Sequence, residues 1–410
     1  MHMYKRSIVL ASLHLIIGAG LLSCKKMVTV PLPLNSITSD EMFKTDAQAT
    51  TAMAGVYAQM VNGPISISNG YVSILTGMSA DELFYYGTGD VYLNTFVPNQ
   101  LLQTNSYTST VWTSGYKIIY NANSVIEGIA ASASTSLTDS ARTQLTAEAK
   151  FVRAFCYFYL TNLFGDVPLV KTVDFNKTRY MARTPVGEVY DQIINDLKEA
   201  QEVLSADYSI SGPAMERILP TKWAATALLA RVYLYRGEYA NAAEQASTVI
   251  SNNLLFSLEA DPLNVFLIKS KEAIWQMKQG TTDAGVRNST IEGFTFIPVI
   301  ATGIARYCLT PVLLNTFETG DRRRTAWVGT TTVTPVNYYP WKYKLGQGTF
   351  SNNPSTEYYM MLRLAEMYLI RAEAAANGAG SVTAAIADLN VIRNRAGVPA
   401  LPATLTQAQV

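Results

Sequence analysis

Two clusters of charged residues have the types and spacing to carry chemistry, one acidic and one basic. The adjacent carboxylates Asp81 and Glu82 raise the question of a glycosidase, whose two catalytic carboxylates must be held roughly 5 to 10 Å apart. Neighbouring residues in a loop do not enforce that separation, so we expect Asp81 and Glu82 to have structural or rim polar roles. The run DRRR at 321–324 suggests a phosphate site, but a solvated turn is the favoured interpretation.

The number and positions of the histidine and cysteine residues exclude several kinds of catalytic site. Both histidines, His2 and His14, lie in the predicted leader, so the mature chain lacks the imidazole of Ser-His-Asp triads and His-ligated zinc. Cys156 and Cys308 show no CxxC spacing; we expect two buried free thiols and leave a disulfide between them open. Lys plus Arg number 32 and Asp plus Glu 31, which gives no electrostatic case for nucleic acid.

The N-terminus has the pattern of a lipoprotein leader. Residues 1–23 combine a basic start with a short apolar run, which predicts a secretory signal peptide. The junction LLSC at 21–24 resembles a bacterial lipobox, in which Cys24 would be lipidated; the alternative is an ordinary signal peptide with an incidental cysteine. We expect residues 24–40 to form an extended tether. No other span reaches the ~20 apolar residues needed to cross a bilayer, so we expect the lipid alone to hold the body at a membrane.

The elements that must position these residues are helical hairpins. The stretch 221–252 places an Ala-x-x-Tyr pair from Ala230 on one helix face, and Gly237 breaks that helix before a second one follows, as in the tetratricopeptide repeat. Similar pairs recur at 154/157 and 365/368. A single hairpin cannot cover its own apolar face, so the sequence predicts stacked neighbours.

The predicted fold is therefore mainly α, with tetratricopeptide-like helical hairpins stacked into a superhelical scaffold. Hairpins are expected near 111–165, 221–252 and 357–397, within a single domain that spans 41–410. Loop-rich insertions at 64–109 and 254–356 should carry short β-hairpins, with one strand at 273–277. Trp112 and Trp223 have apolar neighbours on helices, so both are expected in the core.

Three passages together resemble one family. They are AEAKFVRAFCYFYLTNLFGDVPLV at 147–170, the hairpin at 221–252, and RLAEMYLIRAEAAANG with AIADLNVIRNRAG within 363–397. With the lipobox they are similar to the SusD/RagB family of nutrient-binding outer-membrane lipoproteins of Bacteroidetes-type bacteria. Members of that family usually continue into a further segment rich in Glu and Arg, so the resemblance implies that this chain lacks the usual C-terminal segment.

The resemblance implies a function, a partner and a location. The expected function is non-catalytic capture of an oligosaccharide or glycopeptide at the cell surface, for import through a SusC-like TonB-dependent transporter. The protein would be lipid-anchored and surface-exposed on the outer membrane, with no cofactor; a structural calcium ion is left open. The alternatives are a peptide-binding or scaffold helical-repeat lipoprotein and, ranked last, a lipoprotein glycoside hydrolase.

Both insertions hold residues suited to a sugar. Carbohydrate rings present apolar C–H faces that lie on aromatic planes, and their hydroxyl groups need polar partners around the rim. The alternative for each aromatic residue is that it fills the gap between a loop and the helices. The candidates in the first insertion are Asp81, Tyr85, Tyr86, Tyr92 and Asn94, and those in the second are Arg306, Tyr307, Trp327, Tyr338, Tyr339 and Trp341.

Overall fold

A computed structural model describes residues 39–63, 65–87, 89–280, 288–300, 303–347 and 355–410. The predicted signal peptide, the candidate lipidation site Cys24 and nearly all of the tether lie outside these residues. None of the helices in the described ranges is long and apolar enough to span a bilayer.

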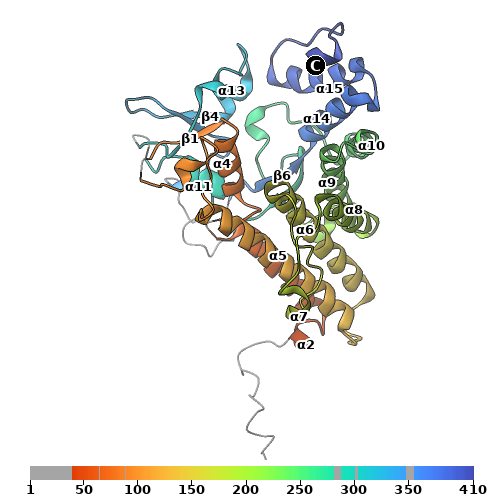
Figure 1. The fold of residues 1–410 in the computed structure, drawn as a ribbon. Coiled ribbons are helices and arrows are strands. Elements are labelled where there is room, and N and C mark those ends of the chain that lie inside the picture. The colour runs from red at the N-terminus through yellow and green to blue at the C-terminus, as the bar shows by residue number, and fades with distance from the viewer. Residues whose placement is uncertain (1–38, 64, 88, 281–287, 301–302, 348–354) are drawn as a thin grey trace, which may run out of the picture.

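The elements divide into a helical scaffold and a loop-rich lobe (Figure 1). The scaffold helices are α3 (Asp46–Val61), α5 (Ser106–Ala131), α6 (Asp139–Phe164), α8 (Val186–Val203), α9 (Lys222–Tyr235), α10 (Tyr239–Ile250), α14 (Leu364–Ala374) and α15 (Val382–Ala396). Shorter helices are α2 (Ser39–Met42), α4 (Gly70–Ser79), α7 (Phe175–Thr178), α11 (Ile291–Phe296), α12 (Pro311–Leu314) and α13 (Arg322–Trp327). The strands are β1 (Leu83–Tyr85), β2 (Ala273–Met277), β3 (Tyr307–Leu309), β4 (Val328–Thr330), β5 (Tyr338–Pro340) and β6 (Tyr359–Arg363).

The scaffold is a row of helices in which each packs on the next. From α5 the order of contact is α6, α8, α9, α10, α14 and α15, and α3 packs against both α5 and α6. Gly237, with a φ of +77°, turns α9 into α10. This left-handed backbone is available to glycine without strain, which is why the hairpin turns there. The predicted fold class, mainly α with stacked helical hairpins and loop-rich insertions, is confirmed.

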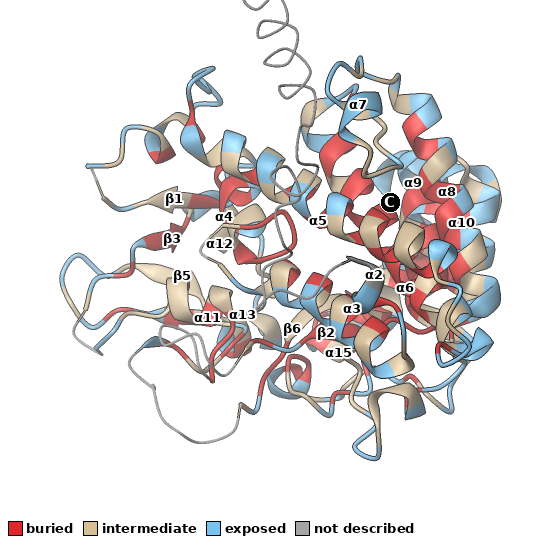
Figure 2. Cartoon of the chain, turned by 90° about the horizontal axis from the view of Figure 1, so that it is seen from below, coloured by how far each residue is buried: buried red, intermediate tan, exposed pale blue. Residues whose placement is uncertain are grey.

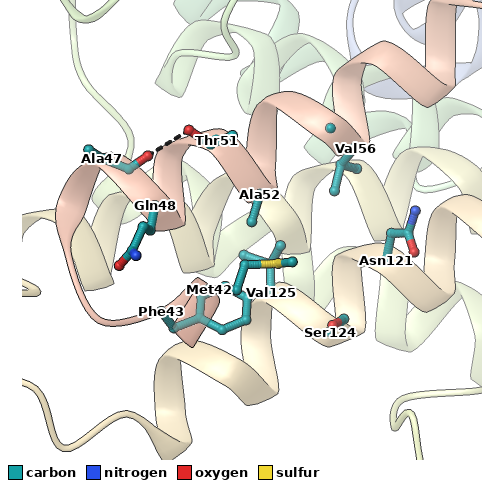
Figure 3. A pocket seen from close by; sticks show the side chains of 11 residues that line it. Met42, Phe43, Ala47, Gln48, Thr51, Ala52, Val56, Asn121, Ser124 and Val125 are labelled. Atoms are coloured by element: carbon teal, nitrogen blue, oxygen red, sulfur yellow. Dashed lines mark hydrogen bonds between the residues drawn. The ribbon is translucent and has the colours of Figure 1, made fainter. Parts of the chain in front are cut away.

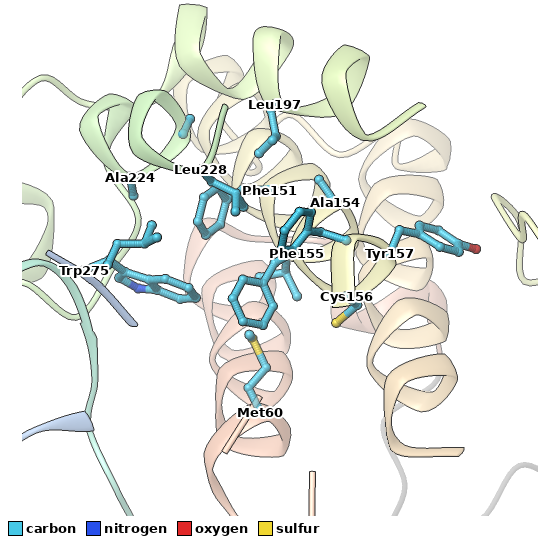
Figure 4. Packing of buried hydrophobic residues seen from close by; sticks show 14 of the residues in the cluster. Met60, Phe151, Ala154, Phe155, Cys156, Tyr157, Leu197, Ala224, Leu228 and Trp275 are labelled. Carbon is cyan, nitrogen blue, oxygen red and sulfur yellow. The ribbon is translucent and has the colours of Figure 1, made fainter. Parts of the chain in front are cut away.

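Helix α6 occupies the centre of the scaffold and is buried on nearly all sides. Thr138 caps its first turn by accepting a hydrogen bond from the backbone amide of Ala141. Phe151 and Phe155 meet the indole of Trp275 edge-on, at ring-centroid distances of 5.0 and 5.7 Å (Figure 4). Since Trp275 belongs to β2, this contact joins the lobe to the scaffold core.

Polar side chains lock neighbouring helices in register. Arg153 of α6 donates to both carboxylate oxygens of Asp196 in α8, at 2.8 and 2.7 Å, and to Oδ1 of Asn123 in α5, at 2.8 Å. All three residues are buried, so the charges are fully paired where an unpaired one would be costly. Arg231 and Glu366 connect α9 to α14 in the same bidentate manner.

The lobe is built from three antiparallel strand pairs, β1–β3, β2–β6 and β4–β5. Each of the first two pairs joins segments far apart in sequence, such as Leu83 with Leu309 and Met277 with Tyr359. Figure 2 shows the buried residues concentrated among α6, α8, α9 and α10, while the lobe is more exposed. The lobe therefore presents its strands and loops from one side of the helical row.

Some local predictions are wrong. Residues 70–79 form helix α4, capped by Asn69, where a loop was expected. The strand β6 occupies 359–363, where the start of a helix was predicted, because pairing with β2 overrides the local pattern. Asp321 is no solvated turn residue, since it is buried and caps α13. Trp112 and Trp223 are half-buried and do not belong to the core proper.

Two local predictions are confirmed, one about the cysteines and one about a strand. Cys156 and Cys308 are both buried and unpaired. The strand expected at 273–277 is β2, with every residue buried.

Candidate functional site

The pairing of β1 with β3 brings the two loop-rich insertions together. Leu83 pairs with Leu309 and Tyr85 with Tyr307. Directly opposed residues of an antiparallel pair project on the same side, and alternate residues of a strand share that side. All four side chains therefore lie along one face of the ribbon, the two leucines at one end and the two tyrosines at the other.

Four tyrosines form a cluster at the Tyr85 end of this face. The Tyr85 and Tyr307 rings lie 5.6 Å apart between centroids. Tyr71 of α4 and Tyr107 of α5 stack at 6.4 Å with an angle of 18° between their planes. Helix α4 packs against β1, which brings the Tyr71–Tyr107 pair beside the Tyr85–Tyr307 pair. We call Tyr71, Tyr85, Tyr107 and Tyr307 the tyrosine cluster.

Asp90 orders the polar edge of the tyrosine cluster. Its Oδ2 accepts a 2.6 Å hydrogen bond from the Tyr107 hydroxyl, and its Oδ1 accepts the backbone amides of Tyr92 and Leu93, each at 3.0 Å. Partial burial alone would raise the pKa of Asp90, but these hydrogen bonds together hold it below its usual value. Asp90 is thus an ionised group whose oxygens already have partners within the chain.

Arg306 supplies the opposite charge at the same place. Its carbonyl oxygen accepts the amide of Tyr86 at 2.8 Å, which continues the β1–β3 ladder by one residue. Burial raises the pKa of Tyr71, and the positive charge of Arg306 partly offsets that rise. The side chain is exposed, and its guanidinium forms no hydrogen bond, ion pair or ring contact with any other described residue.

A cavity of about 380 Å³ opens at the leucine end of the same face. Phe296 connects it to the tyrosine cluster, because its ring lines the cavity and meets Tyr307 edge-on at 6.2 Å. Glu292 lines the wall and accepts a 3.2 Å hydrogen bond from the Tyr359 hydroxyl. Burial raises the pKa of Glu292. The cavity is lined by Ser73, Glu82, Leu83, Glu292, Phe296, Leu309, Leu313, Thr316, Phe317, Arg323, Trp327, Val328, Pro340 and Lys342.

The structure joins some of the sequence-predicted residues at this face. Tyr85, Tyr307 and Arg306 belong to the tyrosine cluster or its edge, and Tyr86 extends the ladder beside them. Trp327 lines the cavity. Their role in binding stays a prediction, since geometry places them together without a ligand.

Other predicted residues serve the loops or lie away from the cluster. Asp81 is exposed, with a φ of +61°, and its carbonyl accepts the Thr310 hydroxyl. Asn94 is exposed. The side chain of Tyr92 is half-buried, and the backbone amide of Tyr92 donates a hydrogen bond to Asp90. In the β4–β5 hairpin, the Tyr339 ring covers Gly329 so closely that no Cβ would fit there.

Two further predicted residues are held by cations. Lys344 lies 3.4 Å from the Trp341 ring centroid, and Arg324 lies 5.7 Å from that of Tyr338. Neither Trp341 nor Tyr338 makes a ring contact with the tyrosine cluster within the described ranges.

Sequence reasoning missed Tyr71, Tyr107 and Glu292. Tyr71 lies on α4, and the glycines at 70 and 77 weaken the helical pattern of that segment in the sequence. Tyr107 lies in the first turn of α5, where the Asn105 side chain accepts the amides of Tyr107 and Thr108. That capping asparagine was the available signal, because it marks a helix start several residues before the predicted one.

The described residues contain no group of three or more His, Cys, Asp or Glu side chains placed to hold a metal ion. Structural calcium stays untested.

A second hollow lies on the scaffold, away from the strands. It is a groove of about 520 Å³ between α3 and α5, and Figure 3 shows Met42, Phe43, Ala52 and Val125 around it. Its lining is mainly apolar, in contrast to the mixed polar and aromatic lining near β1 and β3.

Comparison with models of protein families identifies the family of this chain. A SusD-like family model described as "Starch-binding associating with outer membrane" matches residues 36–234, and a model of the SusD family matches residues 329–409. The chain belongs to the SusD/RagB family. The tyrosine cluster of this SusD-like protein takes residues from the first matched region and from the segment between the two.

Individual relatives agree with that assignment. The SusD-like protein P2 of Formosa agariphila is 28% identical over 401 residues, covering 89% of this chain and 77% of that protein. A crystal structure of a SusD superfamily protein from Bacteroides thetaiotaomicron superposes with a TM-score of 0.74 at 22% identity, over 86% of this chain and 80% of that one. A laminarin-binding SusD-like protein gives a TM-score of 0.72 at 23% identity, over 88% and 86%. These structures share the fold.

Proposed function

We propose that this SusD-like protein is a non-catalytic carbohydrate-binding protein that captures oligosaccharides or glycopeptides. The observation that carries the proposal is the tyrosine cluster, in which half-buried rings from α4, α5 and β1 lie beside the buried ring of Tyr307 in β3. Aromatic faces bind the apolar faces of sugar rings, and the charged groups at the edge serve the hydroxyls. The name of the laminarin-binding neighbour supports a glycan as the class of ligand.

A binding role is favoured over hydrolysis by the carboxylate at the tyrosine cluster and by the adjacent pair that precedes β1. Glycosidases need one carboxylic acid and one carboxylate on opposite sides of a glycosidic bond. Asp90 is held ionised by three hydrogen bonds from the chain, and Asp81 and Glu82 are exposed and adjacent. These residues suit the rim of a binding site.

The cellular setting is part of the same proposal. The protein would be lipid-anchored through Cys24 at the surface of the outer membrane and deliver its glycan to a SusC-like TonB-dependent transporter. The description of the matching family as associated with the outer membrane supports the location. Detection of acylated Cys24 by mass spectrometry and co-purification of a barrel transporter would test these two parts separately.

Binding is tested by calorimetry against a panel of neutral and acidic oligosaccharides. At least one glycan class should bind, and Tyr85→Ala should weaken it roughly 5- to 100-fold, because stacking of one aromatic ring contributes about 1–3 kcal/mol. Tyr180→Ala is the matched control, since Tyr180 is 85% exposed and follows α7, far from the cluster. Silence of the folded protein across the panel would contradict the proposal.

The groove between α3 and α5 favours a second candidate, binding of an apolar peptide segment. An amphipathic helix in an apolar groove is a common mode of peptide recognition. A peptide array bound by the protein, with no glycan binding and with loss of the signal on Ala52→Asp in the groove wall, would promote this function over glycan capture.

A further inference from the structure

We infer that the tyrosine cluster binds an acidic sugar whose carboxylate or sulfate group lies against Arg306. The inference rests on the proposed function and names its class of substrate. It follows from which polar atoms near the cluster already have partners inside the chain and which are left for a ligand.

The hydrogen-bond acceptors beside the cluster are occupied. Both Asp90 oxygens accept bonds from the chain, one from the Tyr107 hydroxyl and the other from two backbone amides. A ligand therefore finds few strong acceptors left at this end of the face.

One charged donor beside the cluster, the guanidinium of Arg306, is free. Every other arginine in the described ranges has a hydrogen bond, an ion pair or an aromatic ring for its guanidinium, and Arg306 has none. Its five N–H groups need acceptors, and a planar guanidinium matches the two oxygens of a carboxylate or sulfate in a bidentate manner. The backbone bond from Tyr86 fixes the start of this side chain at the end of the β1–β3 ladder, one residue before Tyr307.

The distribution of carboxylates gives the bound glycan a direction. Glu82 and Glu292 line the cavity at the leucine end together with two cations, of which Arg323 is already paired with Asp321 and Lys342 lies within reach of the Glu292 charge. A negative group there would find no free guanidinium among the lining residues. Asp90 also places a negative charge near Arg306, but its three hydrogen bonds spread that charge over the chain's own donors. The acidic unit is thus expected over the tyrosine end, with an uncharged unit toward the cavity.

Calorimetry with three probes tests the inference: oligogalacturonate for carboxylate, sulfated galactan oligosaccharides for sulfate, and laminarin oligosaccharides as the neutral glycan. At least one acidic probe should bind, more weakly as salt is raised, and Arg306→Gln should reduce its affinity roughly 10- to 100-fold. Arg306→Lys should retain part of the affinity. The acidic probe that responds identifies the group.

Two matched variants control for net charge. Arg179→Gln removes an exposed positive charge near α7, and Glu188→Gln removes an exposed negative charge on α8; neither should weaken the acidic probe. Neutral binding with no response to Arg306→Gln would overturn the acidic-sugar inference and leave glycan capture standing. Binding of none of the probes, nor of any other glycan, would contradict both.

Discussion

Single polar side chains in this protein differ in whether the chain itself satisfies them. Asp90 and Arg306 lie at the same edge of the tyrosine cluster, yet Asp90 accepts three hydrogen bonds and Arg306 donates none from its side chain. Unsatisfied donors at the rim of an aromatic face are what a ligand can recognise. The aromatic residues alone would fit many sugars, whereas the free guanidinium narrows the class.

Glu148 gives a prediction about pH. It is buried in α6, where it accepts hydrogen bonds from the Tyr57 hydroxyl at 2.7 Å and from Gln144 at 2.9 Å. Burial raises the pKa of Glu148 above its value in the unfolded chain. The folded protein therefore holds this proton more tightly, and Glu148 costs stability as the pH rises above about 4.5.

Glu148→Gln should remove that cost. In urea unfolding, the variant's stability relative to the wild type should improve between pH 4.5 and pH 7.5. Asp191→Asn is the control, because Asp191 lies on the exposed side of α8 and its side chain is 64% exposed. A relative stability of Glu148→Gln that is constant or declining over this interval would contradict the assignment.

Elements with a strong helical pattern could be predicted from the sequence, and elements defined by distant partners could not. The α9–α10 hairpin follows from its Ala-x-x-Tyr pair and Gly237. The strand β6 exists because β2, more than 80 residues earlier, pairs with it, and no local signal distinguishes its apolar run from a helix. Tyr85 and Tyr307 were identified separately, but their contact depends on the β1–β3 pairing.

Two helical glycines give a prediction about packing between elements. At Gly128 in α5, an added Cβ would lie 2.1 Å from the buried ring of Phe43, which directly follows α2, so Phe43 packs on α5 only because glycine has no side chain. Gly128→Ala should destabilise the fold by about 1–3 kcal/mol through overpacking. Gly55 in α3 has open space at its Cβ, so Gly55→Ala should stabilise by about 0.5–1 kcal/mol.

Thermal and denaturant unfolding of both variants measures the contrast. Both substitutions replace a helical glycine by alanine, and they differ in whether a neighbouring side chain already occupies the space of the new Cβ. Equal effects would show that Phe43 does not pack on α5 in this way.

The molecule as a whole is a row of helices that supports one lobe of strands and loops. Glu272, which directly precedes β2 and is fully buried, pairs with Arg363 of β6 at 2.6 Å and with Arg395 of α15 at 2.9 Å. Together with the Trp275 contact to α6, this fixes the lobe at two places along the row. A rigid support keeps the loops ordered before binding, which lowers the entropy cost of capturing a flexible glycan.

Hydrogen–deuterium exchange, with and without a bound oligosaccharide, tests the central claim most directly because it reports on the whole chain at once. Protection should increase across β1 and β3 and at residues 90–107, while α3, α9 and α10 stay unchanged. Protection confined to the groove between α3 and α5, or spread along the scaffold hairpins with β1 and β3 unaffected, would contradict the account.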